Sequence, residues 1–228
     1  MLAVQAGAHT LRYCVPTTLD LMLGRAQRDV CSRRICAWAE SLVRLARVEI
    51  DVTGLEHMAA DETFVVMSNH QSLYDIPVLY QALSRPMRMV AKKELFRIPF
   101  FGHAMTAAEF VRVDRGNRRQ AFEAIDRAKE LVESGLDIWI APEGTRSKNG
   151  DLGEFKRGGF HLALGTGARI LPVTLSGTAR VMPTSGLRIV RRQGVCVTVS
   201  PPIDPKDYGR KRLPELVDAV RQAISAHL

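Results

Sequence analysis

A histidine and an aspartate five positions apart stand in the segment from Asn69 to Asp75, directly after the short apolar run from Phe64 to Met67. A neutral imidazole held by a carboxylate can take a proton from a hydroxyl, which is the requirement for general-base catalysis. Five positions of one continuous helix amount to about 140° of rotation, so His70 and Asp75 would then face different sides. We therefore expect His70 on a turn between a strand and a helix, with Asp75 capping that helix.

The 69–75 segment also has a purely structural interpretation. Residues Ser72 to Asp75 fit a capping box, in which both polar side chains satisfy backbone groups at the start of a helix. Pro77 agrees with either interpretation, because a missing N–H group costs little in the first turn of a helix. This segment alone leaves both possibilities open, so the other polar segments must decide between them.

A second polar segment runs from Pro142 to Ser147 and follows the apolar residues 138–140. Gly144 would let a ligand approach the backbone closely, and Arg146 can grip a phosphate with its planar guanidinium group. Loops beyond the carboxyl ends of strands are the usual ligand sites of α/β folds. The alternative is a polar surface turn with an ion pair between Glu143 and Arg146.

Basic residues follow other expected strands. Lys92 and Lys93 end one of them, residues 112–115 end another, and residues 155–158 precede a helix whose N-terminus suits an anion. Taken singly, each basic residue is typical of a solvated surface. Together they could form a cationic rim around His70.

From residue 48 onward, apolar strand patterns alternate with helical patterns, which predicts an α/β domain with a sheet covered by helices. Strands are expected at residues 48–52, 64–67, 87–91, 110–113, 138–141, 170–174 and 195–199. Helices are expected at residues 76–83, 117–135, 158–164 and from Pro214 onward. The stripe predicted to be buried in the 117–135 helix consists of Phe122, Ile125, Ala128 and Val132.

Residues 1–47 lack strand patterns and are rich in arginine. Ile35, Trp38, Leu42 and Leu45 recur at helical spacing, with arginines on the other side. Such a helix either packs on the core of its own protein or lies in a membrane interface, and a docked helical pair could do both. We therefore divide the chain into an N-terminal helical, membrane-associating segment, 1–47, and an α/β domain, 48–228.

The composition restricts the class of protein. The 228 residues carry a formal net charge of +8, which favours anionic partners, and 46% hydrophobic with 25% charged residues is typical of a folded protein. The four cysteines lack zinc-site spacing and are too few for a disulfide scaffold, which predicts a reducing cytoplasmic setting. Without an apolar stretch of about 18 residues or a signal-peptide pattern, we expect a peripheral protein with no transmembrane span.

Taken in order, four segments resemble the motifs of the glycerolipid acyltransferase family, whose members include 1-acylglycerol-3-phosphate O-acyltransferases. The 69–75 segment looks like the family's H-x-x-x-x-D motif, and Val111 to Arg115 look like its second motif. The 142–147 segment looks like the third motif, and Leu171 to Val173 like the fourth. The resemblance covers about residues 64–174. It departs from the family pattern at Ala141, where an aromatic residue is common, and at Glu109, where glycine is common.

The resemblance implies a mixed, largely parallel sheet flanked by helices, and it implies roles for individual residues. His70 would be the general base for the acceptor hydroxyl, and Asp75 would orient it. The residues matched to binding of the phosphorylated acceptor, or to its pocket, are Lys92, Arg115, Glu143, Gly144, Thr145, Arg146 and Pro172. No metal and no cofactor is implied.

The implied reaction moves a fatty acyl group from acyl-CoA or acyl carrier protein to the hydroxyl of 1-acylglycerol 3-phosphate, at the cytoplasmic face of the cell membrane. Another lysolipid, or glycerol 3-phosphate, is the alternative acceptor. An oxyanion would need donors, which we expect among the backbone N–H groups near the 69–75 segment. Basic clusters at residues 188–192 and 206–212 raise the alternative of nucleic-acid binding, but they include no aromatic platform, and we expect no such partner.

Overall fold

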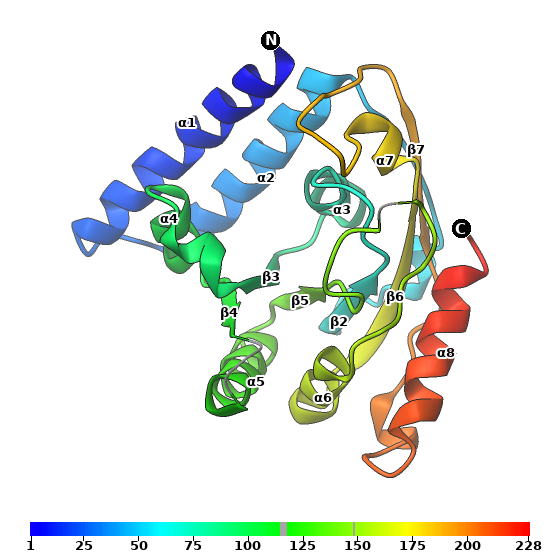
Figure 1. The fold of residues 1–228 in the computed structure, drawn as a ribbon. Helices are drawn as coiled ribbons and strands as arrows, with labels where there is room; N and C mark the ends of the chain where they lie inside the picture. Colours follow the sequence, from blue (N-terminus) through cyan, green and yellow to red (C-terminus); the bar gives the residue numbers. More distant parts are fainter. Residues whose placement is uncertain (115–117, 148) are drawn as a thin grey trace.

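The computed structural model describes residues 1–114, 118–147 and 149–228, and its centre is a seven-stranded sheet (Figure 1). The strand order is β1-β7-β6-β2-β5-β3-β4. All neighbouring strands are parallel except β6 and β7. The predicted mixed, largely parallel sheet is therefore confirmed. The strands are β1 (Glu49–Thr53), β2 (Phe64–Ser68), β3 (Met87–Lys92), β4 (Val111–Val113), β5 (Asp137–Ile140), β6 (Arg169–Ser176) and β7 (Gly194–Val199).

Helices cover both faces of the sheet. Figure 1 shows α5, α6 and α8 below it and the N-terminal helices with α3 and α7 above it. Two separate clusters of buried apolar side chains fill these two layers. The α-helices are α1 (Leu2–Met22), α2 (Arg28–Ala46), α3 (Asp75–Leu83), α4 (Phe101–Ala107), α5 (Arg118–Glu133), α6 (Arg157–Thr166), α7 (Thr178–Val181) and α8 (Leu213–Ser225). Short 3₁₀ helices are η1 (Leu55–His57), η2 (Lys93–Arg97) and η3 (Pro205–Asp207).

The central position of β2 brings the two chemically promising segments together. Every residue of β2 is buried, as expected for a parallel strand that has neighbours and helices on all sides. Met67 pairs with Ile140 of the parallel neighbour β5. His70 and Glu143 each stand three residues beyond that pair, so their loops leave the same edge of the sheet side by side.

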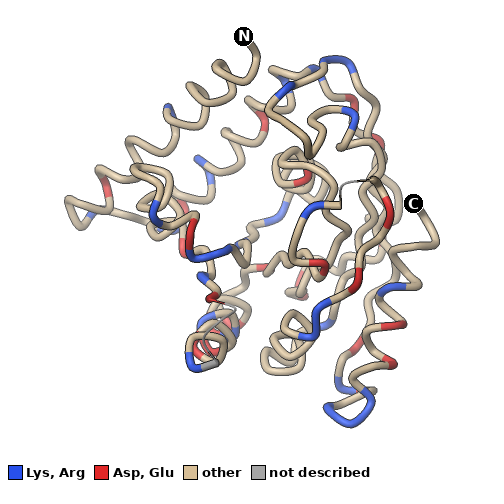
Figure 2. The backbone as a smooth tube through the Cα atoms, viewed as in Figure 1, with Lys and Arg blue, Asp and Glu red and all other residues tan. Residues whose placement is uncertain are grey.

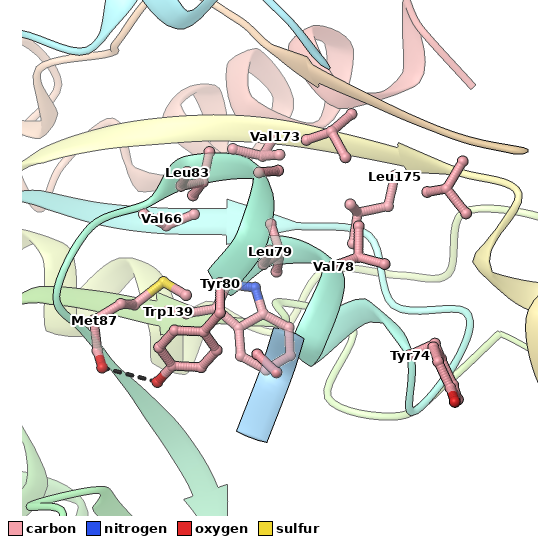
Figure 3. Close-up of a cluster of buried hydrophobic side chains, with 14 of the residues drawn as sticks. Val66, Tyr74, Val78, Leu79, Tyr80, Leu83, Met87, Trp139, Val173 and Leu175 are labelled. Carbon is pink, nitrogen blue, oxygen red and sulfur yellow. Dashed lines mark hydrogen bonds between the residues drawn. The ribbon is translucent and has the colours of Figure 1, made fainter. Parts of the chain in front are cut away.

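Helix α3 is fixed to the sheet by its apolar side chains. Figure 3 shows Val78, Leu79 and Leu83 among the side chains packed over Val66 of β2. The hydroxyl of Tyr80 donates a hydrogen bond to the carbonyl oxygen of Met87, at 2.8 Å. This packing fixes the start of α3, where Asp75 lies.

The predicted buried stripe of α5 is partly wrong, because Phe122 is 56% exposed. The fully buried side of α5 consists of Ala124, Ala128, Leu131 and Val132. Small side chains allow α5 to approach α6 closely: a Cβ atom at Gly165 would lie 2.5 Å from Ile125. Asn117, the expected start of this helix, lies outside the described residues, and Gly135 follows its end with φ +86°.

Helices α1 and α2 form an antiparallel pair, joined by a hydrogen bond from Trp38 Nε1 to Thr10 Oγ1 (3.1 Å) and an ion pair between Arg34 and Asp20 (2.6 Å). The apolar side of α2 packs on the protein core, because Ile35, Trp38 and Leu45 contact the buried cluster above the sheet, to which Leu42 belongs and which we call the upper core cluster. Contact of α2 with lipid stays a prediction. The division of the chain at residues 47 and 48 stays a prediction.

It is α1 that carries exposed apolar residues along one side, namely Val4, Leu11, Leu19 and Met22, and Leu23 directly after the helix is also exposed. The opposite side of α1 contacts α2 and α4. In the part of the chain that the structure describes, none of the helices is both long and apolar enough to span a membrane.

Candidate active site

The structure places His70 and Asp75 in direct contact. Nδ1 of His70 lies 2.6 Å from Oδ2 of Asp75, whose side chain is fully buried. A carboxylate can only accept this hydrogen bond, so we assign the proton to Nδ1. Nε2 then carries a lone pair, and His70 keeps 16% of its side chain exposed. The pair thus has the arrangement that a general base requires.

The same carboxylate also shapes the turn. Oδ2 of Asp75 accepts hydrogen bonds from the backbone N–H groups of Gln71 (2.7 Å) and Ser72 (2.9 Å). Asp75 is the first residue of α3, so it does not cap the helix in the predicted position. Only half of a capping box forms, because the N–H of Asp75 donates to the carbonyl of Ser72 and not to its hydroxyl. One oxygen atom thus both holds the turn before α3 and orients His70.

Two further residues connect the 68–70 region to neighbouring strands of the sheet. The ring of Trp139 in β5 lies edge-on to His70, with centroids 5.7 Å apart, and its Nε1 donates to Ser68 Oγ at 2.9 Å. The side chain of Asn69 donates to the carbonyl of Leu175 (2.8 Å) and accepts from its N–H (2.7 Å). Trp139 was predicted only as a strand residue, because nothing in the sequence places it beside His70.

Glu143 connects the 142–147 segment to His70. Its Oε1 accepts the backbone N–H of His70 at 2.8 Å, and its Oε2 accepts the N–H of Gly153 at 2.8 Å. The N–H of Ser147 donates in turn to the carbonyl of His70, at 2.7 Å. The His70 peptide is therefore held on both sides. The alternative of a surface ion pair between Glu143 and Arg146 is wrong, since no salt bridge joins these two described residues.

Most backbone N–H groups of the 69–75 segment are engaged within the protein, and the expectation of oxyanion donors near this segment stays a prediction. Five N–H groups of the 69–75 segment already donate within the protein, those of His70, Gln71, Ser72, Tyr74 and Asp75. Four of these five satisfy the carboxylates and the hydroxyl that build the turn, and the fifth donates to a carbonyl oxygen. The segment thus uses its backbone donors to hold its own shape.

The other predicted residues that the structure describes differ in their exposure to solvent. Gly144 has φ +74°, a left-handed conformation that favours glycine, and Thr145 lines an open hollow of about 390 Å³ with Ser147 and Lys156. Lys92 ends β3 and is exposed, and Arg146 is half-buried. Pro172 is buried in β6 opposite Met67. Arg115 lies outside the described residues.

Glu109, the position where the family often has glycine, has φ +60°. Its carboxylate accepts two hydrogen bonds from Arg28 of α2, at 2.6 and 2.9 Å, and one from Arg127 of α5, at 2.8 Å. The hydrogen bonds from Arg28 lower the pKa of Glu109. A carboxylate at this strained position thus joins α2 to α5 just before β4.

The fold and site define a class: an α/β sheet that carries a histidine–aspartate pair at the carboxyl end of its central strand. The family described as Acyltransferase matches residues 49–176. The chain therefore belongs to the acyltransferase family, as the motif resemblance predicted.

Individual relatives give a finer comparison. A chloroplast 1-acyl-sn-glycerol-3-phosphate acyltransferase of Brassica napus is 39% identical over 162 residues, covering 71% of this chain and 46% of that protein. The Escherichia coli 1-acyl-sn-glycerol-3-phosphate acyltransferase is 35% identical over 161 residues, covering 70% of this chain and 64% of that protein. The chain thus spans about half the length of the Brassica relative. The crystal structure of the LPA acyltransferase PlsC of Thermotoga maritima is 26% identical with a TM-score of 0.72, covering 96% and 94% of the two chains.

Proposed function

We propose that the protein transfers a fatty acyl group from a thioester to the free hydroxyl of 1-acylglycerol 3-phosphate, giving phosphatidic acid. The observation that carries the proposal is the 2.6 Å contact between His70 and Asp75 in an acyltransferase-family fold. The relatives named for this acceptor support the choice of substrate. Both acyl-CoA and acyl carrier protein fit as donor.

In the proposed mechanism, Nε2 of His70 takes the proton of the acceptor hydroxyl while the oxygen attacks the thioester carbonyl carbon. Asp75 stabilises the imidazolium that forms. Collapse of the tetrahedral intermediate breaks the carbon–sulfur bond, and the leaving thiolate takes the proton back from Nε2. The products are the ester and a free thiol, and no enzyme nucleophile is required.

We assign binding of the phosphorylated acceptor to the residues that the motif resemblance predicted for it. Lys92, Arg115 and Arg146 would supply positive charge for its phosphate, and Gly144 and Thr145 would supply close backbone approach. Pro172 would shape the pocket from β6. The contacts of Glu143 favour a positioning role for this residue, because both of its oxygens already accept backbone N–H groups.

We further propose that the protein binds the cytoplasmic face of an anionic membrane as a peripheral protein, through residues 1–47. The exposed apolar side of α1 supports this proposal, and Leu95, Ile98 and Phe100 are exposed beside α1 and α4. The hydroxyl of Thr18 in α1 donates to the carbonyl of Phe100 at 2.8 Å, so the two apolar surfaces are adjacent. A helix with one apolar side can lie in the headgroup region without crossing the bilayer.

The reaction is tested by incubating the purified protein with each acyl donor and a panel of lysolipids and glycerol 3-phosphate, and by identifying products by mass spectrometry. We expect phosphatidic acid from 1-acylglycerol 3-phosphate. The His70→Ala variant should lose roughly 10²–10⁴-fold in turnover while keeping the thermal unfolding midpoint of the wild type within a few degrees. A folded His70→Ala variant with normal turnover would remove His70 from the mechanism.

A further inference from the structure

A group of arginines lies far from His70 in the sequence and has no part in the proposed reaction. It belongs to residues 183–192, which join α7 to β7 and which we call the basic loop. Arg188, Arg191 and Arg192 of this loop are exposed. Figure 2 shows basic residues, in blue, gathered in this loop and again in the turn before α8.

The basic loop is held firmly against the end of α2. Nε of Arg191 donates to the carbonyl of Leu45 at 3.0 Å, and the N–H of Arg192 donates to the carbonyl of Ala46 at 2.9 Å. Ile189 is buried in the upper core cluster. The guanidinium groups of Arg188 and Arg192 are therefore presented from a fixed backbone.

The positive charge of the basic loop is not neutralised within the described protein. None of Arg188, Arg191 and Arg192 forms a salt bridge with a described carboxylate, and neither does the adjacent Arg47. Some arginines elsewhere are paired with carboxylates, for example Arg127 with Glu109 and Glu130. Like charges so close together repel one another, and an external anionic partner relieves this repulsion.

The same loop also carries an exposed apolar residue. Leu187 is 66% exposed and directly precedes Arg188. Arginines beside an exposed leucine suit the boundary between lipid headgroups and acyl chains, where the leucine enters the apolar layer and the guanidinium groups meet phosphates. A soluble acidic protein would match the charge but would leave Leu187 without an apolar partner.

The basic loop lies at the same end of the molecule as the start of α1. Trp38 contacts Thr10 and Arg34 contacts Asp20, so α1 and α2 run antiparallel, and the start of α1 lies beside the end of α2. That end of α2 is also where the basic loop is attached. Figure 1 shows the loop and the N-terminus at this shared end. The loop therefore lies near the start of α1, at one end of the helix already proposed to contact lipid.

We propose that the basic loop is a second membrane-binding element, which docks on anionic lipid headgroups through Arg188, Arg191 and Arg192 and inserts Leu187. This inference rests on the membrane contact proposed for α1. It also connects membrane binding to the site, because the hydroxyl of Ser72 in the 69–75 segment donates to the carbonyl of Met182, directly before the loop, at 2.8 Å. Docking of the loop would then hold the 69–75 segment at the level of the headgroups, where a lysolipid hydroxyl lies.

The test measures binding of the full chain to vesicles of phosphatidylcholine with 0 to 40% phosphatidylglycerol. The triple variant Arg188→Gln, Arg191→Gln, Arg192→Gln should lose about 100-fold in partition coefficient at high phosphatidylglycerol content, since each arginine near an anionic surface contributes about 1 kcal/mol. The matched control neutralises three exposed residues before α8, as Lys206→Gln, Arg210→Gln, Lys211→Gln. It should change binding by less than about threefold. Leu187→Ala, which keeps every charge, should weaken binding roughly tenfold.

Each outcome bears on a different proposal. If the wild-type protein does not bind anionic vesicles, the membrane contact proposed for α1 is itself wrong. Wild-type binding that the triple variant retains, or that both triple variants weaken equally, overturns the basic loop alone. A vesicle-free assay with a short-chain, water-soluble acceptor tests whether the basic loop instead binds the acyl donor. If the triple variant there raises KM for acyl-CoA or acyl carrier protein by more than about tenfold, the loop binds the donor and the membrane assignment is wrong.

Discussion

At the scale of residues, one buried oxygen atom of Asp75 carries three contacts, with His70 and with two backbone N–H groups of its own turn. The sequence predicted the partnership of His70 and Asp75 from residue types and from the order of the motifs. It did not predict that Glu143 would hold the His70 peptide, because that contact joins residues 73 positions apart. Contacts of this kind depend on strand order, which single-residue patterns do not encode.

Replacing Glu143 with glutamine tests its positioning role. The amide nitrogen cannot accept a hydrogen bond, so one backbone N–H, of His70 or of Gly153, is left unpaired in a buried site. A loss of 1–3 kcal/mol corresponds to a fall in kcat of roughly 5- to 150-fold, with KM for the acceptor changed less than threefold. Steady-state kinetics measure both values. The control is Glu154→Gln, an exposed carboxylate that should leave kcat unchanged. A raised acceptor KM at normal kcat would instead place Glu143 on the substrate.

Glu109 makes a prediction about stability and pH. Its pKa is lowered in the folded protein by Arg28, so its contribution is complete above the ordinary value of 4.5 and is lost as the pH falls through the lowered value. Glu109→Gln should therefore reduce the free energy of unfolding at pH 7, and the difference from wild type should shrink below about pH 4. Urea unfolding at several pH values measures it, with the exposed Glu133→Gln as control. A difference that stays constant with pH would contradict the role of the charge.

At the scale of elements, strands and most helices after residue 48 followed the predicted pattern, because parallel strands buried on both faces are continuous apolar runs. The helix at residues 118–133 was found, but its buried side was misjudged at Phe122. Large apolar residues dominate a hydrophobic pattern, whereas this helix approaches α6 through Ala124 and Ala128. In α2 the pattern was right, and only the structure shows that its apolar side meets the protein core.

Packing of α3 on the sheet should determine both stability and the position of Asp75. Leu79→Ala removes a fully buried side chain and should lower the free energy of unfolding by about 2–5 kcal/mol. Leu73→Ala, at an exposed leucine of the neighbouring turn, should lower it by less than about 1 kcal/mol. Chemical denaturation compares the two variants. Equal losses would show that α3 does not depend on its contact with the sheet.

At the scale of the whole molecule, the net charge of +8 and the exposed apolar side of α1 favour a surface protein of anionic membranes. The sequence pointed to α2 because its apolar pattern is the clearer one, whereas the structure shows the row of exposed apolar residues on α1. α1 exposes its apolar residues after packing its other side on α2 and α4. Which of two helices faces solvent is decided by their packing, and this information is not local.

The membrane proposal for α1 is tested with substitutions on its exposed side. A triple variant, Val4→Gln, Leu11→Gln, Met22→Gln, should bind anionic vesicles at least about tenfold more weakly. The reason is that it lacks three exposed apolar side chains that would move from water into the lipid. Turnover on a short-chain, water-soluble acceptor should stay within about threefold of wild type. Vesicle co-sedimentation and steady-state kinetics provide the two readouts. Unchanged co-sedimentation would show that α1 does not face lipid.

The double attachment of the His70 peptide has a consequence for protein engineering. Glu143 accepts the N–H of His70, and Ser147 donates to the carbonyl of His70, so the 69–75 and 142–147 segments are held rigidly together. Transplanting the histidine–aspartate pair into another scaffold would therefore require both loops, carried by two adjacent parallel strands in the register of Met67 and Ile140. A scaffold with antiparallel strands at that edge could contain all seven residues of the 69–75 segment, but it would not supply the second loop that orients the imidazole.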